Sequence, residues 1–147
     1  MGTRKAMNTR DASHVFCLVL QVFIGGFFLV TGVSKAIDPL GFAGEIANYR
    51  IVTGWLTLAT AHYLPWLEIV AGAGLFVRRI RTGALLVCGG LLLVFTAALV
   101  ATCARGLDIR CGCIGGVPTT VPLALLRNAI LLAACGAIVR IWSRKKH

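Results

Sequence analysis

Long apolar runs dominate the chain, and they are continuous rather than spaced at helical intervals. A helix that crosses the roughly 30 Å hydrocarbon core of a bilayer needs about 20 apolar residues. Four runs reach that length, at His14–Ala36, Trp55–Val77, Thr82–Ala104 and Val121–Trp142. Most polar residues lie between these runs or at the two ends. The pattern predicts an all-α integral membrane four-helix bundle, with residues 1–147 forming a single transmembrane domain.

The composition agrees with this prediction. Of 147 residues, 58% are hydrophobic and only 14% are charged, whereas a soluble domain of this size needs more polar surface to cover its core. The first run follows a basic segment, as in a signal peptide. It is longer than a usual signal core and no clear small-residue cleavage site follows it, so we expect a retained helix.

The formal net charge of +10 is distributed in a way that argues against a nucleic-acid partner. Most of the basic residues fall at three places that share one side of a four-helix topology. They are Arg4, Lys5, Arg10, Arg78, Arg79, Arg81, Arg140, Arg144, Lys145 and Lys146. The positive-inside rule then predicts a multi-pass protein of the cell (inner) membrane with both termini in the cytoplasm. The loop after the third run would face the periplasm or the cell exterior.

That outward loop carries the most distinctive chemistry of the sequence, "RGLDIRCGCIGG", in which only Gly112 separates Cys111 from Cys113. The other cysteines lie in the apolar runs, and free cysteine in such a run packs as a small hydrophobe. This is the expectation for Cys17, Cys88 and Cys135. Cys103 differs because it ends the third run on the outer side, where it is a candidate third thiol. Disulfides persist on that side of the membrane.

A disulfide across one intervening residue closes a very small ring. The bond requires a defined torsion and Cα atoms roughly 4.4–6.8 Å apart, and Gly112 supplies the backbone freedom for it. Strain makes such a bond easier to reduce, and Arg110 could stabilise a thiolate leaving group. We therefore predict Cys111 and Cys113 as the catalytic pair of a thiol–disulfide oxidoreductase or disulfide donor. Arg110, Gly112 and Cys103 are the candidate auxiliary residues.

Two other interpretations of the pair stay open at this point. It could be a structural clip, or it could hold a soft metal such as zinc or Cu(I). The outer side adds only Cys103 and His62 as further ligands, an incomplete set without zinc-finger spacing, so we expect no metal centre. The alternative functions are a metal-handling membrane protein (zinc, copper or mercury) and a non-catalytic assembly subunit of a membrane complex.

The segment after the first run, "AIDPLGFAGEIANYRIV", contains a helix signal of its own. Asp38 and Pro39 form an N-cap and first-turn pair. Apolar residues follow at roughly helical spacing, at Leu40, Phe42, Ile46 and Tyr49. The pattern predicts a short interfacial helix along the outer surface that covers the cysteine loop. An ordinary connector is the alternative.

Two charged residues lie at membrane depth, Glu68 in the second run and Arg127 in the fourth. Charges in a bilayer are costly and are usually paired or functional. Counting from the cytoplasmic ends at about 1.5 Å per residue places the two at similar depth. They are predicted as an intramembrane polar pair that joins the helices. The alternative is a polar pocket for the head group of a quinone.

Several segments together resemble the MauE branch of the DoxX-like membrane proteins. They are "GVSKAIDPLGFAGEIANYRIV", "YLPWLEIVAGAGL", "FTAALVATCARGLDIRCGCIGG" and "ALLRNAILL". The likeness extends from the first helix through the fourth. The most specific part is the arginine-glycine pair, the acidic residue and the Cys-Gly-Cys after the third helix.

The resemblance implies a DoxX-like four-helix fold and a role in methylamine metabolism. Proteins of the MauE family are encoded with genes for methylamine use. They are associated with maturation of the methylamine dehydrogenase small (β) subunit, a disulfide-rich periplasmic client. A thioredoxin-like partner, MauD, is thought to act with them. The expected function is therefore extracytoplasmic thiol–disulfide exchange through Cys111 and Cys113, with a quinone or another protein's thiols as the electron partner.

Overall fold

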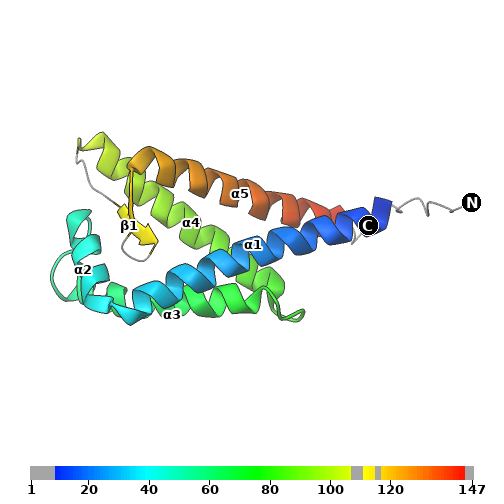
Figure 1. The fold of residues 1–147 in the computed structure, drawn as a ribbon, viewed down its shortest axis with the longest axis horizontal. Helices are drawn as coiled ribbons and strands as arrows, with labels where there is room; N and C mark the ends of the chain where they lie inside the picture. Colours follow the sequence, from blue (N-terminus) through cyan, green and yellow to red (C-terminus); the bar gives the residue numbers. More distant parts are fainter. Residues whose placement is uncertain (1–8, 107–110, 115–116, 145–147) are drawn as a thin grey trace, which may run out of the picture.

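The computed structural model describes residues 9–106, 111–114 and 117–144, and the side chains of residues 12–106 and 120–143. The elements in chain order are α1 (Thr9–Ile37), α2 (Pro39–Asn48), α3 (Trp55–Gly74), α4 (Arg81–Ala104), β1 (Cys111–Ile114), β2 (Val117–Thr119) and α5 (Val121–Arg144). The four long helices run along the long axis of the molecule (Figure 1). Both termini lie at one end of this axis, and α2 and β1 lie at the other.

Three helices in the described part of the chain are long and apolar enough to cross a membrane, at Ala12–Ile37, Arg81–Ala104 and Val121–Ser143. The predicted membrane character is confirmed for these three. The helix α3 is shorter than predicted because it ends at Gly74 rather than Val77, and it carries His62, Pro65 and Glu68 within its length. The fourth span and the DoxX-like arrangement stay predictions.

The outside of the helices is covered with large apolar side chains. Examples on α1 and α4 are Phe16, Phe23, Val30, Leu86, Leu93 and Val100, each more than half exposed. Contiguous apolar surface of this extent is rare on a soluble protein. It matches helices whose outer faces contact lipid while their backbone groups are satisfied internally.

Small residues bring α1 and α3 into close contact. A Cβ atom at Gly72 would lie 2.9 Å from the backbone oxygen of Gly25, and one at Gly32 would lie 2.9 Å from the backbone oxygen of Pro65. Membrane helices commonly pack at such positions, since small residues let the two backbones approach. The two contacts fix the register of α1 against α3.

The remaining helices complete a closed arrangement in which α1 and α4 each pack against both α3 and α5. A hydrogen bond from the Asn128 side chain to the Thr96 hydroxyl, 3.3 Å long, links α5 to α4. At the terminal end, the Arg81 guanidinium lies 4.6 Å from the ring centre of Trp142. Because α3 and α5 each pack between α1 and α4, the two lie diagonally opposite each other.

The short helix predicted after the first long helix is present as α2. The Asp38 carboxylate accepts a hydrogen bond from the Gly41 backbone N–H at 2.9 Å, and Pro39 occupies the first turn. The apolar face of α2 buries Phe42, Ala43 and Ile46 against α3 and its surroundings. The helix also contacts β1, in keeping with the predicted covering of the cysteine loop.

The all-α prediction is confirmed for the body of the fold, to which the structure adds one short β-hairpin. The strands β1 and β2 form an antiparallel hairpin between α4 and α5, with Cys111 paired to Thr119 and Ile114 paired to Val117. The sequence carried a signal for this hairpin. Two short segments with β-branched residues flank a Gly-Gly pair, and this pattern is typical of a β-turn between strands.

Candidate functional site

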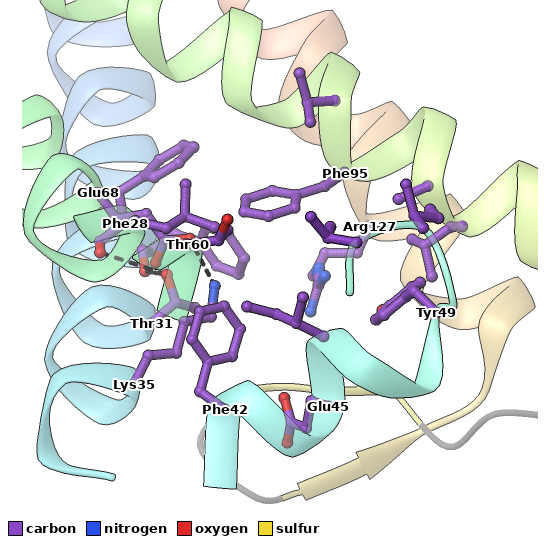
Figure 2. Close-up of a pocket in the computed structure, with 18 residues that line it drawn as sticks. Phe28, Thr31, Lys35, Phe42, Glu45, Tyr49, Thr60, Glu68, Phe95 and Arg127 are labelled. Carbon is purple, nitrogen blue, oxygen red and sulfur yellow. Dashed lines mark hydrogen bonds and ion pairs between the residues drawn. The ribbon is translucent and has the colours of Figure 1, made fainter. Parts of the chain in front are cut away.

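A cavity of about 180 Å³ lies at the hairpin end of the bundle. All five helices contribute to its walls, which are mainly apolar (Figure 2). Phe28, Thr31 and Lys35 come from α1, Phe42 and Glu45 from α2, Glu68 from α3, Phe95 from α4 and Arg127 from α5. The short helix α2 closes the cavity on the side of β1.

The central polar contact of the cavity is an ion pair between Lys35 and Glu68. The Lys35 Nζ atom lies 2.6 Å from Oε1 of Glu68, and both side chains are almost fully buried. The same ammonium lies 4.9 Å from the ring centre of Phe42 and 4.8 Å from that of Phe95. Aromatic rings stabilise a cation over their faces, so the ammonium is held by one carboxylate and two rings.

The register of α1 and α3 explains how these two residues meet. The Gly25–Gly72 and Gly32–Pro65 contacts place Lys35 on α1 opposite His62 on α3. Glu68 lies six residues further along α3, which is about 9 Å along the helix axis. Helical side chains lean towards the N-terminus of their own helix. Because α1 and α3 are antiparallel, Lys35 and Glu68 lean towards each other and close this distance.

The predicted ion pair between Glu68 and Arg127 is wrong, because Glu68 has a different partner. Glu68 pairs with Lys35, while Arg127 lies on the opposite wall of the same cavity (Figure 2). The physical reason is the diagonal placement of α3 and α5. The neighbouring helix α1 packs directly on α3 through its glycines and supplies the cation instead. As in the alternative prediction, both residues line one cavity, although its walls are mainly apolar.

Arg127 is only partly satisfied by its surroundings. Its Nη2 atom donates to the Asn128 Oδ1 atom at 3.3 Å, and its guanidinium lies 5.1 Å from the ring centre of Phe27. Among the described residues, the buried Nε and Nη1 atoms have no hydrogen-bond partner, and neither does Oε2 of Glu68. The cavity thus holds unpartnered donors on one wall and an unpartnered acceptor on the other.

The rim near α2 adds two groups whose titration is shifted by burial. Burial raises the pKa of Glu45 above its usual value, although the nearby positive charge of Lys35 opposes this and the negative charge of Asp38 adds to it. Burial also raises the pKa of Tyr49, helped by the negative charge of Glu45. Both residues line the cavity.

The predicted catalytic cysteines lie in one short strand at this end of the molecule. The backbone of Cys111, Gly112 and Cys113 forms β1, which contacts α1, α2 and α5. The side chains of these residues, and Arg110 as a whole, lie outside the described part. Cys103 is a free, exposed thiol at the end of α4.

The remaining cysteines follow the prediction from the apolar runs. Cys17, Cys88 and Cys135 are free and are buried in the main hydrophobic core. Cys88 is 0% exposed. Thiols enclosed in this way are out of reach of a partner protein, so the cysteines divide into a buried set in the core and a second set whose positions lie at the hairpin end. No three His, Cys, Asp or Glu side chains form a metal-binding group among those that the structure describes.

Comparison with known proteins places this arrangement in a family. The family model described as methylamine utilisation protein MauE matches residues 13–143. The chain belongs to the MauE family. The match begins in α1 and ends in α5, so it includes the cavity, α2 and the hairpin.

Individual relatives agree with this assignment. The methylamine utilization proteins MauE of Methylophilus methylotrophus, Methylorubrum extorquens and Paracoccus versutus are 36%, 34% and 33% identical to this chain over 95, 126 and 122 residues. The matches cover 64%, 80% and 80% of this chain, and 50%, 68% and 66% of the relatives' own lengths. No solved structure matches the chain.

The residue that sequence reasoning missed is Lys35. It lies at the end of the first apolar run, and only Glu68 and Arg127 were predicted as charges at membrane depth. One signal was available. Lysine leans back along its helix, and Gly25 and Gly32 mark the face of α1 on which another helix can pack.

Proposed function

We propose that this MauE-family chain is a membrane partner in extracytoplasmic thiol–disulfide exchange, with Cys111 and Cys113 as the exchanging pair. It would support maturation of a disulfide-containing periplasmic client in methylamine utilisation, such as the methylamine dehydrogenase small (β) subunit. A thioredoxin-like protein of the MauD type would be its direct partner. The observation that carries the proposal is the position of both cysteines in one strand, β1, at the end of the bundle that carries α2 and apart from the buried thiols of the core.

The backbone of the hairpin suits a bond that breaks and re-forms. Alternate Cα atoms of an extended strand lie about 6.6 Å apart, near the upper limit of roughly 6.8 Å for a disulfide. Between its paired residues, β1 has Gly112 and Cys113 where β2 has only Pro118. An extra residue of this kind bends and twists a strand, so Cys111 and Cys113 are not held at the spacing of a regular strand, and a ring closed near the distance limit would be strained and easier to reduce.

The redox proposal is tested by trapping the mixed disulfide through which exchange must pass. The chain is produced with a thioredoxin-like partner and the methylamine dehydrogenase small subunit, both carrying identifying tags. Removal of one cysteine leaves the other without a resolving thiol, so Cys111→Ser or Cys113→Ser should accumulate a reductant-sensitive adduct with one of the two proteins. The double variant should form none through this hairpin.

Two matched variants make the trapping specific. Cys88→Ala removes a fully buried thiol and should leave both adduct formation and client maturation unchanged. Cys103→Ser removes the exposed thiol at the end of α4, and a loss of exchange there would identify a third participating cysteine. Full client maturation in both hairpin variants would contradict the proposed exchange.

The metal-handling alternative predicts a different outcome from the same proteins. Purified chain would contain zinc, copper or mercury in proportion to intact Cys111 and Cys113, and a chelator would abolish its activity. The exchange proposal expects activity that follows the thiol count and is indifferent to chelation. A non-catalytic assembly subunit would retain its activity when both hairpin cysteines are replaced.

A further inference from the structure

We propose that the cavity binds the ring of a membrane quinone, which accepts the electrons released when Cys111 and Cys113 form their disulfide. The inference rests on the proposed exchange function and identifies its electron acceptor by chemical class. The observation that carries it is the pairing of unpartnered buried polar atoms with an aromatic, otherwise apolar wall, in a cavity beside the cysteine hairpin.

The size of the cavity fits a substituted six-membered ring. An apolar protein cavity of about 150 Å³ takes up benzene, and this cavity measures about 180 Å³. Phe27, Phe28, Phe42 and Phe95 all line it. Aromatic side chains pack favourably against another ring in offset or edge-on geometry, so the walls suit a flat ring better than a flexible chain.

The polar atoms select a neutral ligand that can both accept and donate hydrogen bonds. On one wall, the buried Nε and Nη1 atoms of Arg127 have no partner within the described residues, and on the other Oε2 of Glu68 has none. A quinone carbonyl can accept from Arg127, and the hydroxyl of the reduced quinol can donate to Glu68. A carboxylate or phosphate could accept from Arg127 but, having no proton to donate, would leave Oε2 of Glu68 without a partner.

The cavity also has an opening that suits a ligand dissolved in the bilayer. Two of its lining residues are exposed, Val94 on α4 at 65% and Ile51 after α2 at 49%. Both are apolar, so the exposed part of the lining on α4 and after α2 is hydrocarbon. A quinone ring could enter there while its isoprenoid tail stays in the lipid.

The chemistry balances without any further reactant. Two thiols lose two electrons and two protons as the sulfur–sulfur bond forms, and the quinone takes up two electrons and two protons to become a quinol. The strand that carries the cysteines contacts α1, α2 and α5, and each of these helices contributes side chains to the cavity wall. Donor and acceptor are therefore held by the same elements.

Binding is tested separately from redox chemistry. Purified chain in lipid nanodiscs is titrated with ubiquinone-1, a benzoquinone with one isoprenoid unit, and the dissociation constant is measured. The Cys111→Ser/Cys113→Ser double variant should bind as the unaltered chain does. Lauric acid serves as the competing probe for an anionic lipid. The quinone inference would be overturned if ubiquinone-1 did not bind, or if lauric acid bound in the cavity and ubiquinone-1 did not. Either result would leave the exchange proposal standing.

Neighbouring residues on α4 provide a matched pair of variants for the cavity. Ala98 lines it, while Ala97 is exposed on the outer face of the helix. We expect Ala98→Phe to fill the space and weaken ubiquinone-1 binding at least about tenfold, a change of about 1.4 kcal/mol. Ala97→Phe adds the same ring outside and should leave binding unchanged. Equal affinities for the two variants would contradict binding in this cavity.

A third variant tests the polar wall and the coupled reaction. Arg127→Met removes the unpartnered donors and should weaken ubiquinone-1 binding to a similar extent. An unchanged dissociation constant in this variant would contradict the proposed contact between Arg127 and the quinone carbonyl. When the unaltered chain is first reduced and then mixed with ubiquinone-1, one molecule of ubiquinol should form for each Cys111–Cys113 thiol pair that is oxidised. If ubiquinone-1 binds in the cavity but no ubiquinol forms while client exchange proceeds, the acceptor assignment is wrong. If exchange itself is absent, the proposed function fails instead.

Discussion

The two ends of the bundle are built from similar apolar helices but have opposite interiors. Towards the termini, the core is closely packed, with Ile24, Cys88, Leu92 and Ile138 at most 1% exposed. Towards the hairpin, the same helices surround a cavity that contains Lys35, Glu68 and Arg127. Buried charges cost stability in a bilayer and are commonly kept for a function. The packed end holds the helices together, and the open end carries the candidate chemistry.

The largest difference between the ends is expected in their exposure to the outside of the cell. In a background without other cysteines, a membrane-impermeant thiol reagent should label Cys103 at the hairpin end in intact cells. A thiol introduced by Ser143→Cys, exposed at the terminal end, should react only after permeabilisation. The reverse pattern would invert the topology and place the hairpin in the reducing cytoplasm, where stable disulfides are rare.

The next largest effect concerns the ion pair at the open end. Removal of one partner strands a buried charge, so Lys35→Met and Glu68→Gln should each destabilise the chain by about 3–5 kcal/mol. The double variant should lose less than the sum, with a coupling energy of at least about 1 kcal/mol. The free energy of unfolding in detergent measures both.

The cycle between Glu68 and Arg127 is the matched control for that measurement. These residues line the same cavity but are not bonded to each other, so their coupling should be clearly smaller than that of Lys35 and Glu68. Strict additivity for Lys35 and Glu68 would contradict the ion pair as a structural unit.

A smaller effect is expected where α1 crosses α3. A methyl group at Gly72 would overlap the backbone oxygen of Gly25 at 2.9 Å, and overpacking of this kind costs about 1–3 kcal/mol. Gly72→Ala should therefore lower the unfolding free energy by this amount. Gly26→Ala is the control because no atom lies within 4 Å of its added Cβ, so equal losses in both variants would disprove the close crossing.

The smallest effect is a pH dependence at the rim of the cavity. Burial raises the pKa of Glu45 in the folded chain, so the folded state binds this proton more tightly than the unfolded state does. The resulting stability is present below the unfolded value of 4.5 and is lost as the pH rises through the raised value. Glu45→Gln should remove this slope from the melting temperature measured between about pH 4 and about pH 7.

The sequence by itself determined where two of the long helices begin and which three cysteines are buried. Continuous apolar runs and helix caps depend only on neighbouring residues, so the starts at Trp55 and Val121 and the Asp38 cap follow from local physics. The burial of Cys17, Cys88 and Cys135 was predictable for the same reason, since an apolar run has few other places for a thiol. The MauE-family likeness was also visible in contiguous motifs.

Only the tertiary structure decided which helices are neighbours, and therefore which charges meet. Glu68 could be matched to any cation at similar depth until the glycine contacts of α1 and α3 fixed their register. That register lets Lys35 reach Glu68 and leaves Arg127 facing a cavity from the diagonal helix. Depth along a helix is a one-dimensional quantity, whereas pairing also depends on which faces turn towards each other, and that is set by packing between distant segments.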